Sequence, residues 1–225
     1  MKQTQHIKAY HLILNKILHE NYSPGTPMKE DKLAEEIGMS STPVREALRQ
    51  LEREGWLETI PYRGCFIKHY TQSDVEELAA MRKSVEIVGA EKFIERATTD
   101  DFECLNDVMQ RSDELLIKIE KKEISESEAT NILHQLDCEF HNYLISGTHC
   151  ERIIRFATVW SQQLHRYAIT SFFDEHNATS MESFSKSVSL VIRAHKAIIL
   201  ALELKWTKAA IELISAHIPP RSRFL

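Results

Sequence analysis

The sequence has few of the features that mark an exported or membrane-embedded protein. No apolar run approaches the roughly 20 residues that a helix needs to cross a bilayer. Residues 1–11 carry lysines without a long apolar stretch behind them, so we expect no secretory signal. The four cysteines are scattered and form no CxxC pair, which favours reduced thiols over a disulfide framework. We therefore expect a cytoplasmic protein that makes no membrane contact.

Glycine and proline are also scarce, with six of each in 225 residues. This scarcity argues against a β protein with many turns and against a chain dominated by loops. Hydrophobic residues make up 43% of the chain and charged residues 27%, which allows a buried core and argues against disorder. The length fits one large domain or two modest ones.

A global excess of positive charge is missing as well. The formal net charge is −5, although residues 1–69 hold 10 Lys or Arg against 9 Asp or Glu. The excess acid therefore lies in the rest of the chain. Any contact with nucleic acid must come from a few locally placed cations and not from the field of the whole protein.

The N-terminal segment has the pattern of helices followed by a hairpin. Apolar periodicity predicts helices over 7–20 and 30–37, separated by the Pro/Gly break "NYSPGTP". Further along, "LETIPYRGCFIKHY" consists of two strand-like runs around Pro61 to Gly64. This order predicts a small helical domain with a β-hairpin at its end.

Between these parts, the turn "MSS" leads into a third helix. Thr42 is a suitable N-cap, Pro43 suits the first helical position, and Gly55 suits the C-terminal end. Two short helices joined by a tight turn form a helix-turn-helix, and the trailing hairpin is then the wing. The first segment therefore reads as a winged helix-turn-helix.

The third helix carries a stripe of arginines opposite its packing face. Arg45, Arg49 and Arg53 recur at i, i+4 and i+8. One interpretation is a solvated face with Arg–Glu pairs, because Glu46 and Glu52 lie close by. The turn, the cap and the wing together favour contact with DNA instead.

From residue 71 onward the pattern is helical, which predicts an all-α antiparallel bundle of about six helices. Capping signals predict that helices open at Ser73, Asp100 and Ser125. Further helices are expected at about 150–170, 185–204 and 207–217, with a loop at 174–185. The fold class as a whole is mainly α.

Four polar side chains fall on or beside the apolar faces of these helices. Asp137 and His141 lie one turn apart on a helix predicted over 127–145, and His195 and His217 lie in apolar stripes further on. A lone histidine on such a face is usually a satisfied core residue. Three imidazoles and a carboxylate are costly to bury unpaired, whereas a shared divalent metal removes that cost. A metal site and separate core histidines both remain open at this point.

The phrase "LAEEIGMSSTPVREALRQLEREGWLE…RGCFI" resembles the GntR family of bacterial transcription regulators. The second half is similar to the FCD subgroup through "MRKSVE", "DCEFH", "RAHKAI" and "AAIELISAHI". The resemblance implies that Asp137, His141, His195 and His217 hold a divalent metal, with zinc expected first and nickel, iron or manganese as alternatives. It also implies that a small carboxylate effector completes the coordination. Arg82 is a candidate to bind that carboxylate, and a structural salt bridge is the alternative.

Two positions depart from the family pattern. Ser41 stands where the family usually has Arg, so one expected DNA contact is lost and operator preference is expected to differ. Ala194 stands where Glu often precedes the third ligand, which alters the surroundings of the metal.

These observations predict a homodimeric DNA-binding regulator of a palindromic operator, controlled by a small molecule. Residues 1–70 are expected to bind DNA, and residues 71–225 to bind the effector and to dimerise. The recognition helix should enter the major groove, the wing should approach the minor groove, and other residues should bind phosphates. The residues expected at the DNA are Lys32, Ser40, Ser41, Thr42, Arg45, Arg49, Arg63 and Gly64.

Two alternatives stay open. A His/Asp metal site with an open position can activate water, so a metal-dependent enzyme is one of them. No HExxH-like arrangement supplies a general base beside the ligands, and Glu139 lies on a different helix face from Asp137. The other alternative is a regulator whose metal is purely structural or absent.

Overall fold

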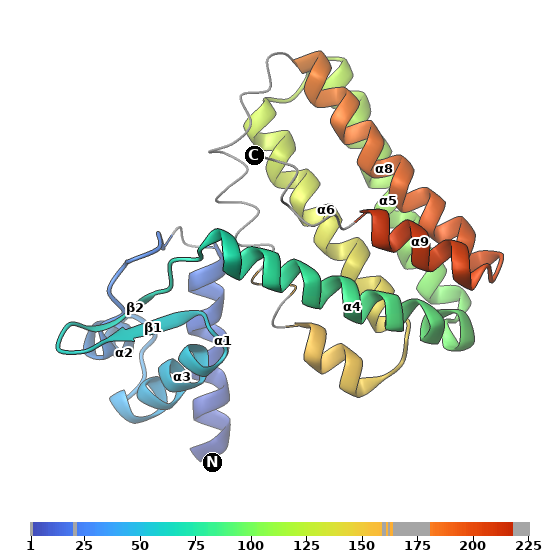
Figure 1. The fold of residues 1–225 in the computed structure, drawn as a ribbon. Helices are drawn as coiled ribbons and strands as arrows, with labels where there is room; N and C mark the ends of the chain where they lie inside the picture. Colours follow the sequence, from blue (N-terminus) through green and yellow to red (C-terminus); the bar gives the residue numbers. More distant parts are fainter. Residues whose placement is uncertain (1, 20–21, 159–160, 162, 164–180, 218–225) are drawn as a thin grey trace. The chain divides into compact units, whose positions relative to one another are not determined.

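The computed structural model describes residues 2–19, 22–158, 161, 163 and 181–217 (Figure 1). The chain divides into two compact units, Met1–Thr71 and Gln72–Leu225. The described residues are mostly helical, and their two-stranded sheet lies in the first unit. The expected mainly α fold is therefore confirmed. Among these residues, each helix lacks either the length or the apolar character that spanning a lipid bilayer requires.

The first unit consists of helices around a small core, followed by a hairpin. Its elements are α1 (Lys2–His19), α2 (Glu30–Glu36), α3 (Ser41–Arg53), β1 (Leu57–Ile60) and β2 (Gly64–Ile67). Helix α3 packs against α1, α2 and β1. Ile13, Leu51 and Trp56 are almost completely buried between them. Because this core holds the apolar face of α3, the opposite face with Arg45 and Arg49 is exposed.

Helix α3 begins earlier than the sequence signals predicted. Ser40 is the N-cap, and its side chain makes no capping hydrogen bond, so the assignment of Thr42 as N-cap was wrong. Pro43 therefore occupies the third helical position. Proline is tolerated there because the first N–H groups of a helix have no intrahelical partner to lose.

The hairpin has the geometry expected of a wing. Strands β1 and β2 are antiparallel, with Leu57 opposite Ile67 and Ile60 opposite Gly64. The chain reverses through residues 61–63, where Tyr62 has a φ of 62° and its side chain is fully exposed. Gly64 has a φ of 104°, which L side chains rarely adopt. Glycine is therefore required at the base of this turn.

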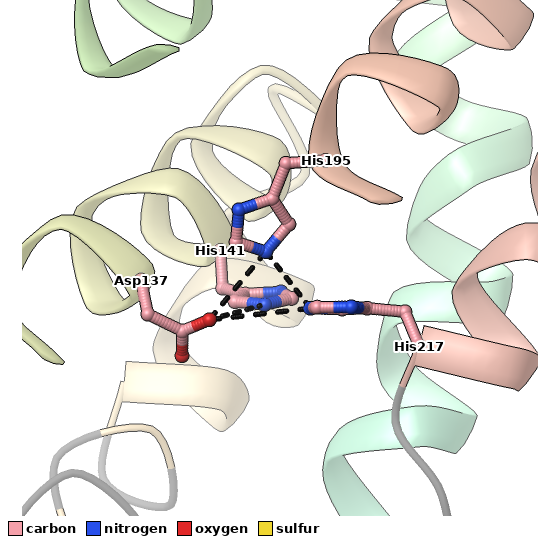
Figure 2. Close-up of side chains that lie close together, drawn as sticks. All are labelled: Asp137, His141, His195 and His217. Carbon is pink, nitrogen blue, oxygen red and sulfur yellow. Dashed lines mark hydrogen bonds and ion pairs between the residues drawn. The ribbon is translucent and has the colours of Figure 1, made fainter. Parts of the chain in front are cut away.

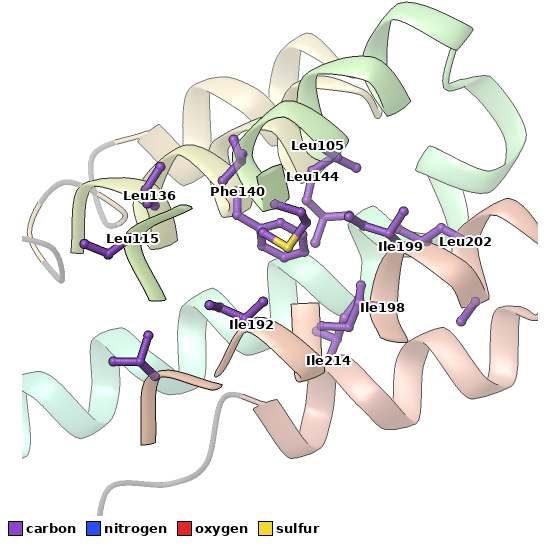
Figure 3. Packing of buried hydrophobic residues seen from close by; sticks show 14 of the residues in the cluster. Leu105, Leu115, Leu136, Phe140, Leu144, Ile192, Ile198, Ile199, Leu202 and Ile214 are labelled. Carbon is purple, nitrogen blue, oxygen red and sulfur yellow. The ribbon is translucent and has the colours of Figure 1, made fainter. Parts of the chain in front are cut away.

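The second unit is a helical bundle. Its elements with full bounds are α4 (Gln72–Arg96), α5 (Thr99–Glu120), α6 (Glu126–Ser146), α8 (Met181–Glu203) and α9 (Thr207–His217). Helix α5 packs against α6 and α8, and α9 packs against α4 and α8. Apolar side chains from α5, α6, α8 and α9 meet in one core, which Figure 3 shows from close by. Phe140, Leu144, Ile198 and Ile214 are among its fully buried members.

One of the three predicted helix starts in this unit is confirmed. Ser125 caps α6 by accepting a hydrogen bond from the backbone N–H of Glu128. Helix α4 begins at Gln72, so Ser73 lies inside the helix and is not its cap. Helix α5 is capped by Thr98 in a reciprocal box with Asp101, so the start assigned to Asp100 was two residues late. In both cases several neighbouring residues are suitable caps, so the sequence signal fixes the helix end only to within one or two residues.

Two further boundaries differ from expectation. Helix α8 begins at Met181, so residues 181–185 of the predicted 174–185 loop are helical, and residues 174–180 lie outside the described residues. Of the helix expected at about 150–170, residues 151–158, 161 and 163 are helical, and most of the remainder lies outside the described residues.

Candidate metal centre and nucleic-acid interface

The four metal-ligand candidates meet in the bundle (Figure 2). Helix α6 carries Asp137 and His141 one turn apart, α8 carries His195, and α9 carries His217 at its last residue. One ligand atom of each side chain lies within 4.8 Å of all the others. Residues from three helices, far apart in sequence, therefore form one compact donor set.

One carboxylate oxygen of Asp137 lies within 4 Å of all three imidazoles. Its Oδ1 is 3.5 Å from Nε2 of His141, 3.4 Å from Nε2 of His195 and 3.9 Å from Nε2 of His217. Burial alone would raise the pKa of Asp137, but His141, His195 and Arg82 outweigh it and hold the pKa well below its usual range. The group is therefore a carboxylate at neutral pH.

His195 and His217 face each other through their Nε2 atoms, which are 2.8 Å apart. Burial lowers the pKa of His195, and it lowers that of His217 to about 3, with a further contribution from the two neighbouring imidazoles. Both rings are therefore neutral near pH 7, and each keeps one nitrogen lone pair. Phe140 stacks on His195 with ring centroids 3.9 Å apart, which fixes the plane of that imidazole.

These side chains fit a divalent metal. Three imidazole nitrogens and one carboxylate oxygen are ligands that zinc and its neighbours among the transition metals accept. The buried Nε2 of His141 has no hydrogen-bond partner among the described residues, and it faces the other three donors. A buried polar atom without a partner is costly, and a cation would satisfy it.

A buried carboxylate lies behind His141. Glu86 on α4 is 2% exposed, and its Oε2 is 2.8 Å from Nδ1 of His141. Burial would raise the pKa of Glu86, but His141 and Arg82 outweigh it and lower the pKa to about 2. By contrast, burial and Arg82 act to lower the pKa of His141, and the carboxylates of Glu86 and Asp137 raise it overall.

Arg82, the candidate for effector binding, lies beside the same groups. Its Nε donates to Oε1 of Glu86 at 2.7 Å, and its terminal nitrogen is 3.7 Å from Oδ2 of Asp137. Sequence reasoning gave Glu86 no separate role. Its position four residues after Arg82 on an otherwise apolar stripe was the signal for a buried ion pair.

A small cavity adjoins these residues. Its volume is about 20 Å³, enough for roughly one water molecule. Its lining includes Arg82, Glu86, His141, Asn142 and Ser161. The cavity therefore shares His141 with the metal-ligand cluster, whereas His195 and His217 are not part of its lining.

The DNA-contact candidates divide into two groups. An open groove of about 740 Å³ between α2, α3 and the hairpin is lined by Lys32, Arg45, Arg49, Arg63 and Gly64. Ser40, Ser41 and Thr42 lie instead at the N-terminal end of α3, where Ser40 and Thr42 are exposed and Ser41 is half-buried.

The groove is not uniformly basic, because Glu30, Asp31 and Glu52 also line it. Arg45 donates through two nitrogens to the two carboxylate oxygens of Glu30, at 2.7 and 2.8 Å. Its side chain is nevertheless 57% exposed. The guanidinium therefore lies at the surface with its plane set by Glu30.

Comparison with known families agrees with both halves of this description. Residues 6–67 match the family described as bacterial regulatory proteins, gntR family, and residues 77–219 match the FCD domain. The chain belongs to the GntR family. The resemblance seen in the sequence is thereby confirmed, and the protein is a GntR-family transcription regulator with an FCD effector-binding domain.

Relatives of this GntR regulator are also named as transcriptional regulators. The HTH-type transcriptional regulator YdhC of Bacillus subtilis is 24% identical over 212 residues, which cover 94% of this chain and 87% of that protein. The HTH-type transcriptional repressor RspR of Escherichia coli is 25% identical over 144 residues, which cover 64% of this chain and 59% of that protein. Both are regulators of transcription by name.

Solved structures share the fold. McbR/YncC of E. coli has a TM-score of 0.70 at 18% sequence identity, covering 95% of this chain and 93% of that one. A GntR-type putative transcriptional regulator from Rhodococcus sp. RHA1 has a TM-score of 0.69 at 18% identity, covering 96% and 94%. At this identity the likeness concerns the fold alone.

Proposed function

We propose that this GntR regulator binds a palindromic operator as a homodimer and that a small carboxylate effector controls its affinity at a metal-containing pocket. In this proposal residues 1–70 bind DNA, and residues 71–225 bind the effector and dimerise. The observation that supports it most is that Asp137 and three imidazoles lie close together. The same chain also has an exposed recognition helix.

Asp137, His141, His195 and His217 would hold the metal, with zinc expected first and nickel, iron or manganese as alternatives. A bound divalent ion would offer an open coordination position to an oxygen of the effector. Geometry supports this assignment because the four donors lie close enough to share one ion.

Arg82 would pair with the carboxylate of the effector. Its guanidinium has five N–H donors, and its contacts with Glu86 and Asp137 leave others for a ligand. The side chain is 18% exposed, so it is not completely enclosed by the protein. With these remaining donors, Arg82 can keep its ion pair with Glu86 and bind a carboxylate anion at the same time.

The DNA-binding residues would divide by role. Arg45 and Arg49 would reach bases or phosphates in the major groove, and Arg63 and Gly64 would approach the minor groove. Lys32 and residues 40–42 would bind phosphates, which position the protein without specifying sequence. The exposure of Arg45 and Arg49 on α3 supports this assignment.

Coupling between the two ends would run through α4. This helix begins at Gln72, a few residues after β2 ends at Ile67, and it carries Arg82 and Glu86 beside the ligand cluster. Allosteric coupling free energies are typically ~1–3 kcal/mol, which changes affinity about 5- to 150-fold.

A test combines metal analysis with DNA binding. Operators would be selected from random-sequence duplex DNA, and affinity measured by fluorescence anisotropy with zinc alone and with zinc plus a panel of small carboxylates. We expect about one zinc per chain, and at least one carboxylate should change operator affinity by about 5-fold or more. In His195→Ala, both the bound zinc and the carboxylate response should be lost.

His149→Ala is the matched control, because His149 is exposed and pairs with Asp101 outside the cluster. It should behave like the parent protein. Parent protein that holds no zinc after supplementation would contradict the metal site. Catalytic turnover that disappears in His195→Ala would support an enzyme instead.

A further inference from the structure

Glu86 uses both carboxylate oxygens in the interior of the bundle. Oε1 accepts from Nε of Arg82 at 2.7 Å, and Oε2 contacts Nδ1 of His141 at 2.8 Å. Glu86 and His141 are each 2% exposed. Bulk solvent therefore has little access to this contact, and the protonation states of the two side chains set the direction of the hydrogen bond.

An ionised carboxylate accepts hydrogen bonds and donates none. The proton of the contact must therefore lie on Nδ1 of His141, whether the ring is neutral or charged. In the neutral ring, Nε2 is then the bare nitrogen. This atom faces Asp137, His195 and His217, so its lone pair points to the place where a shared ion would lie.

We propose that Glu86 is a positioning residue for the metal, which selects the His141 tautomer whose Nε2 can bind it, and that Arg82 fixes the orientation of Glu86. This inference rests on the proposed metal site. Histidine ligands commonly donate their second N–H to a carboxylate, and loss of that partner typically lowers metal affinity about 10- to 100-fold.

Arg82 makes a sharp test available. Nε of Arg82 is only a donor, so in Glu86→Gln it must face the carbonyl oxygen of the new amide. The NH₂ group of the amide is then turned toward His141, and Nδ1 must accept. The proton moves to Nε2, where it blocks the metal. Glu86→Gln, although nearly isosteric, should therefore weaken zinc binding about 10- to 100-fold.

Removing the donor should reverse this effect. In the double variant Arg82→Met with Glu86→Gln, the amide is free to turn its carbonyl oxygen toward His141. Zinc should then bind more tightly to the double variant than to Glu86→Gln alone. A residue that merely fills space would give the opposite order, because the double variant removes more native contacts.

The measurements are zinc affinity by chelator competition and the protonation of His141 by ¹⁵N NMR of the full-length chain. Nδ1 of His141 should carry a proton in the parent protein and none in Glu86→Gln. Glu95→Gln is the control, since it makes the same change on an exposed part of α4. Circular dichroism would verify that all variants retain the helical content of the parent.

The outcomes separate the two proposals. If the parent binds zinc and Glu86→Gln binds it within about threefold, Glu86 has no positioning role, and the metal site stands. If the parent binds no zinc but Nδ1 loses its proton in Glu86→Gln, Glu86 does select the tautomer, and the proposed metal-dependent regulation fails. An unprotonated Nδ1 in the parent overturns the inference directly.

Discussion

Two arginine–glutamate pairs in this chain have similar geometry and opposite surroundings. On the recognition helix, Arg45 contacts Glu30 at 2.7 and 2.8 Å, with side-chain exposures of 57% and 25%. In the bundle, Arg82 contacts Glu86 at 2.7 Å, with exposures of 18% and 2%. The same two residue types therefore form one pair at an accessible surface and one pair in a buried interior.

Surroundings decide what each pair can do. Water can replace either partner of the exposed pair, so Arg45 can exchange Glu30 for a phosphate or a base. In the buried pair, separating the partners leaves an uncompensated charge in a poorly solvated interior. The first pair is therefore suited to recognition and the second to holding His141 and Asp137 in place.

The largest expected effect comes from breaking the buried pair. Glu86→Ala removes the carboxylate between Arg82 and His141 and leaves the guanidinium and the imidazole N–H without their main acceptor. We expect a loss of ~3–5 kcal/mol in the free energy of unfolding, measured by urea denaturation of the metal-free protein. Glu95→Ala, an exposed pair partner on the same helix, should cost much less. Equal losses in the two variants would contradict the difference in surroundings.

Metal removal should have the next largest effect, on the thermal stability of the bundle. A zinc ion bound only to the folded state stabilises it by ~4 kcal/mol at about 1,000 times its dissociation constant. Chelation should therefore lower the melting temperature of the bundle by about 8–16 °C, measured by differential scanning calorimetry. His195→Ala should show the lower value from the outset and should not respond to the chelator. A chelator response in that variant would place the metal elsewhere.

The exposed pair is tested by DNA binding. Arg45→Ala should weaken operator affinity about 5- to 150-fold if Arg45 reads a base, and it should leave the melting temperature nearly unchanged. Glu30→Ala frees the guanidinium from its carboxylate and should change affinity less than Arg45→Ala does. Lys8→Ala, an exposed cation of α1, is the control. Unchanged binding in Arg45→Ala would refute its assigned role.

The smallest expected effect concerns the cap of α5. Thr98→Ala removes hydrogen bonds to Asp101 and should cost ~1 kcal/mol at pH 7. Although partial burial acts to raise the pKa of Asp101, Thr98 and His149 outweigh it and lower that pKa. A carboxyl group with a lowered pKa stabilises the fold above its unfolded pKa of about 4, and this contribution is lost as pH falls. The difference between variant and parent, measured by urea denaturation, should therefore shrink between pH 7 and pH 3.

Sequence periodicity located the helices better than their ends. Apolar spacing identified α3, α6 and α9, because burial of one face imposes a 3.6-residue period. The starts of α3, α4 and α5 were misplaced by a few residues, since several polar residues near each start can act as caps. A helix end is therefore fixed by such signals only to within one or two residues.

The ligand candidates show a similar division. Spacing placed Asp137 and His141 on one helix, because residues four apart share a face. Nothing in the local pattern could bring His195 and His217 within reach of them, as their helices meet α6 only through the folded core. Their positions on apolar helix faces made all four residues candidates, and the resemblance to the GntR family with its FCD subgroup implied that they share one metal.

By itself, the sequence determined a mainly α fold, an exposed arginine stripe and the polar residues on apolar helix faces, because these depend on short-range periodicity and capping chemistry. Only the tertiary structure decided which charges became partners. It paired Arg45 with Glu30 at the exposed surface. It placed Glu86 between Arg82 and His141 in the buried interior of the bundle. Burial and hydrogen-bond direction depend on neighbours that are distant along the chain, and these properties separate an adaptable DNA contact from a fixed ligand cluster.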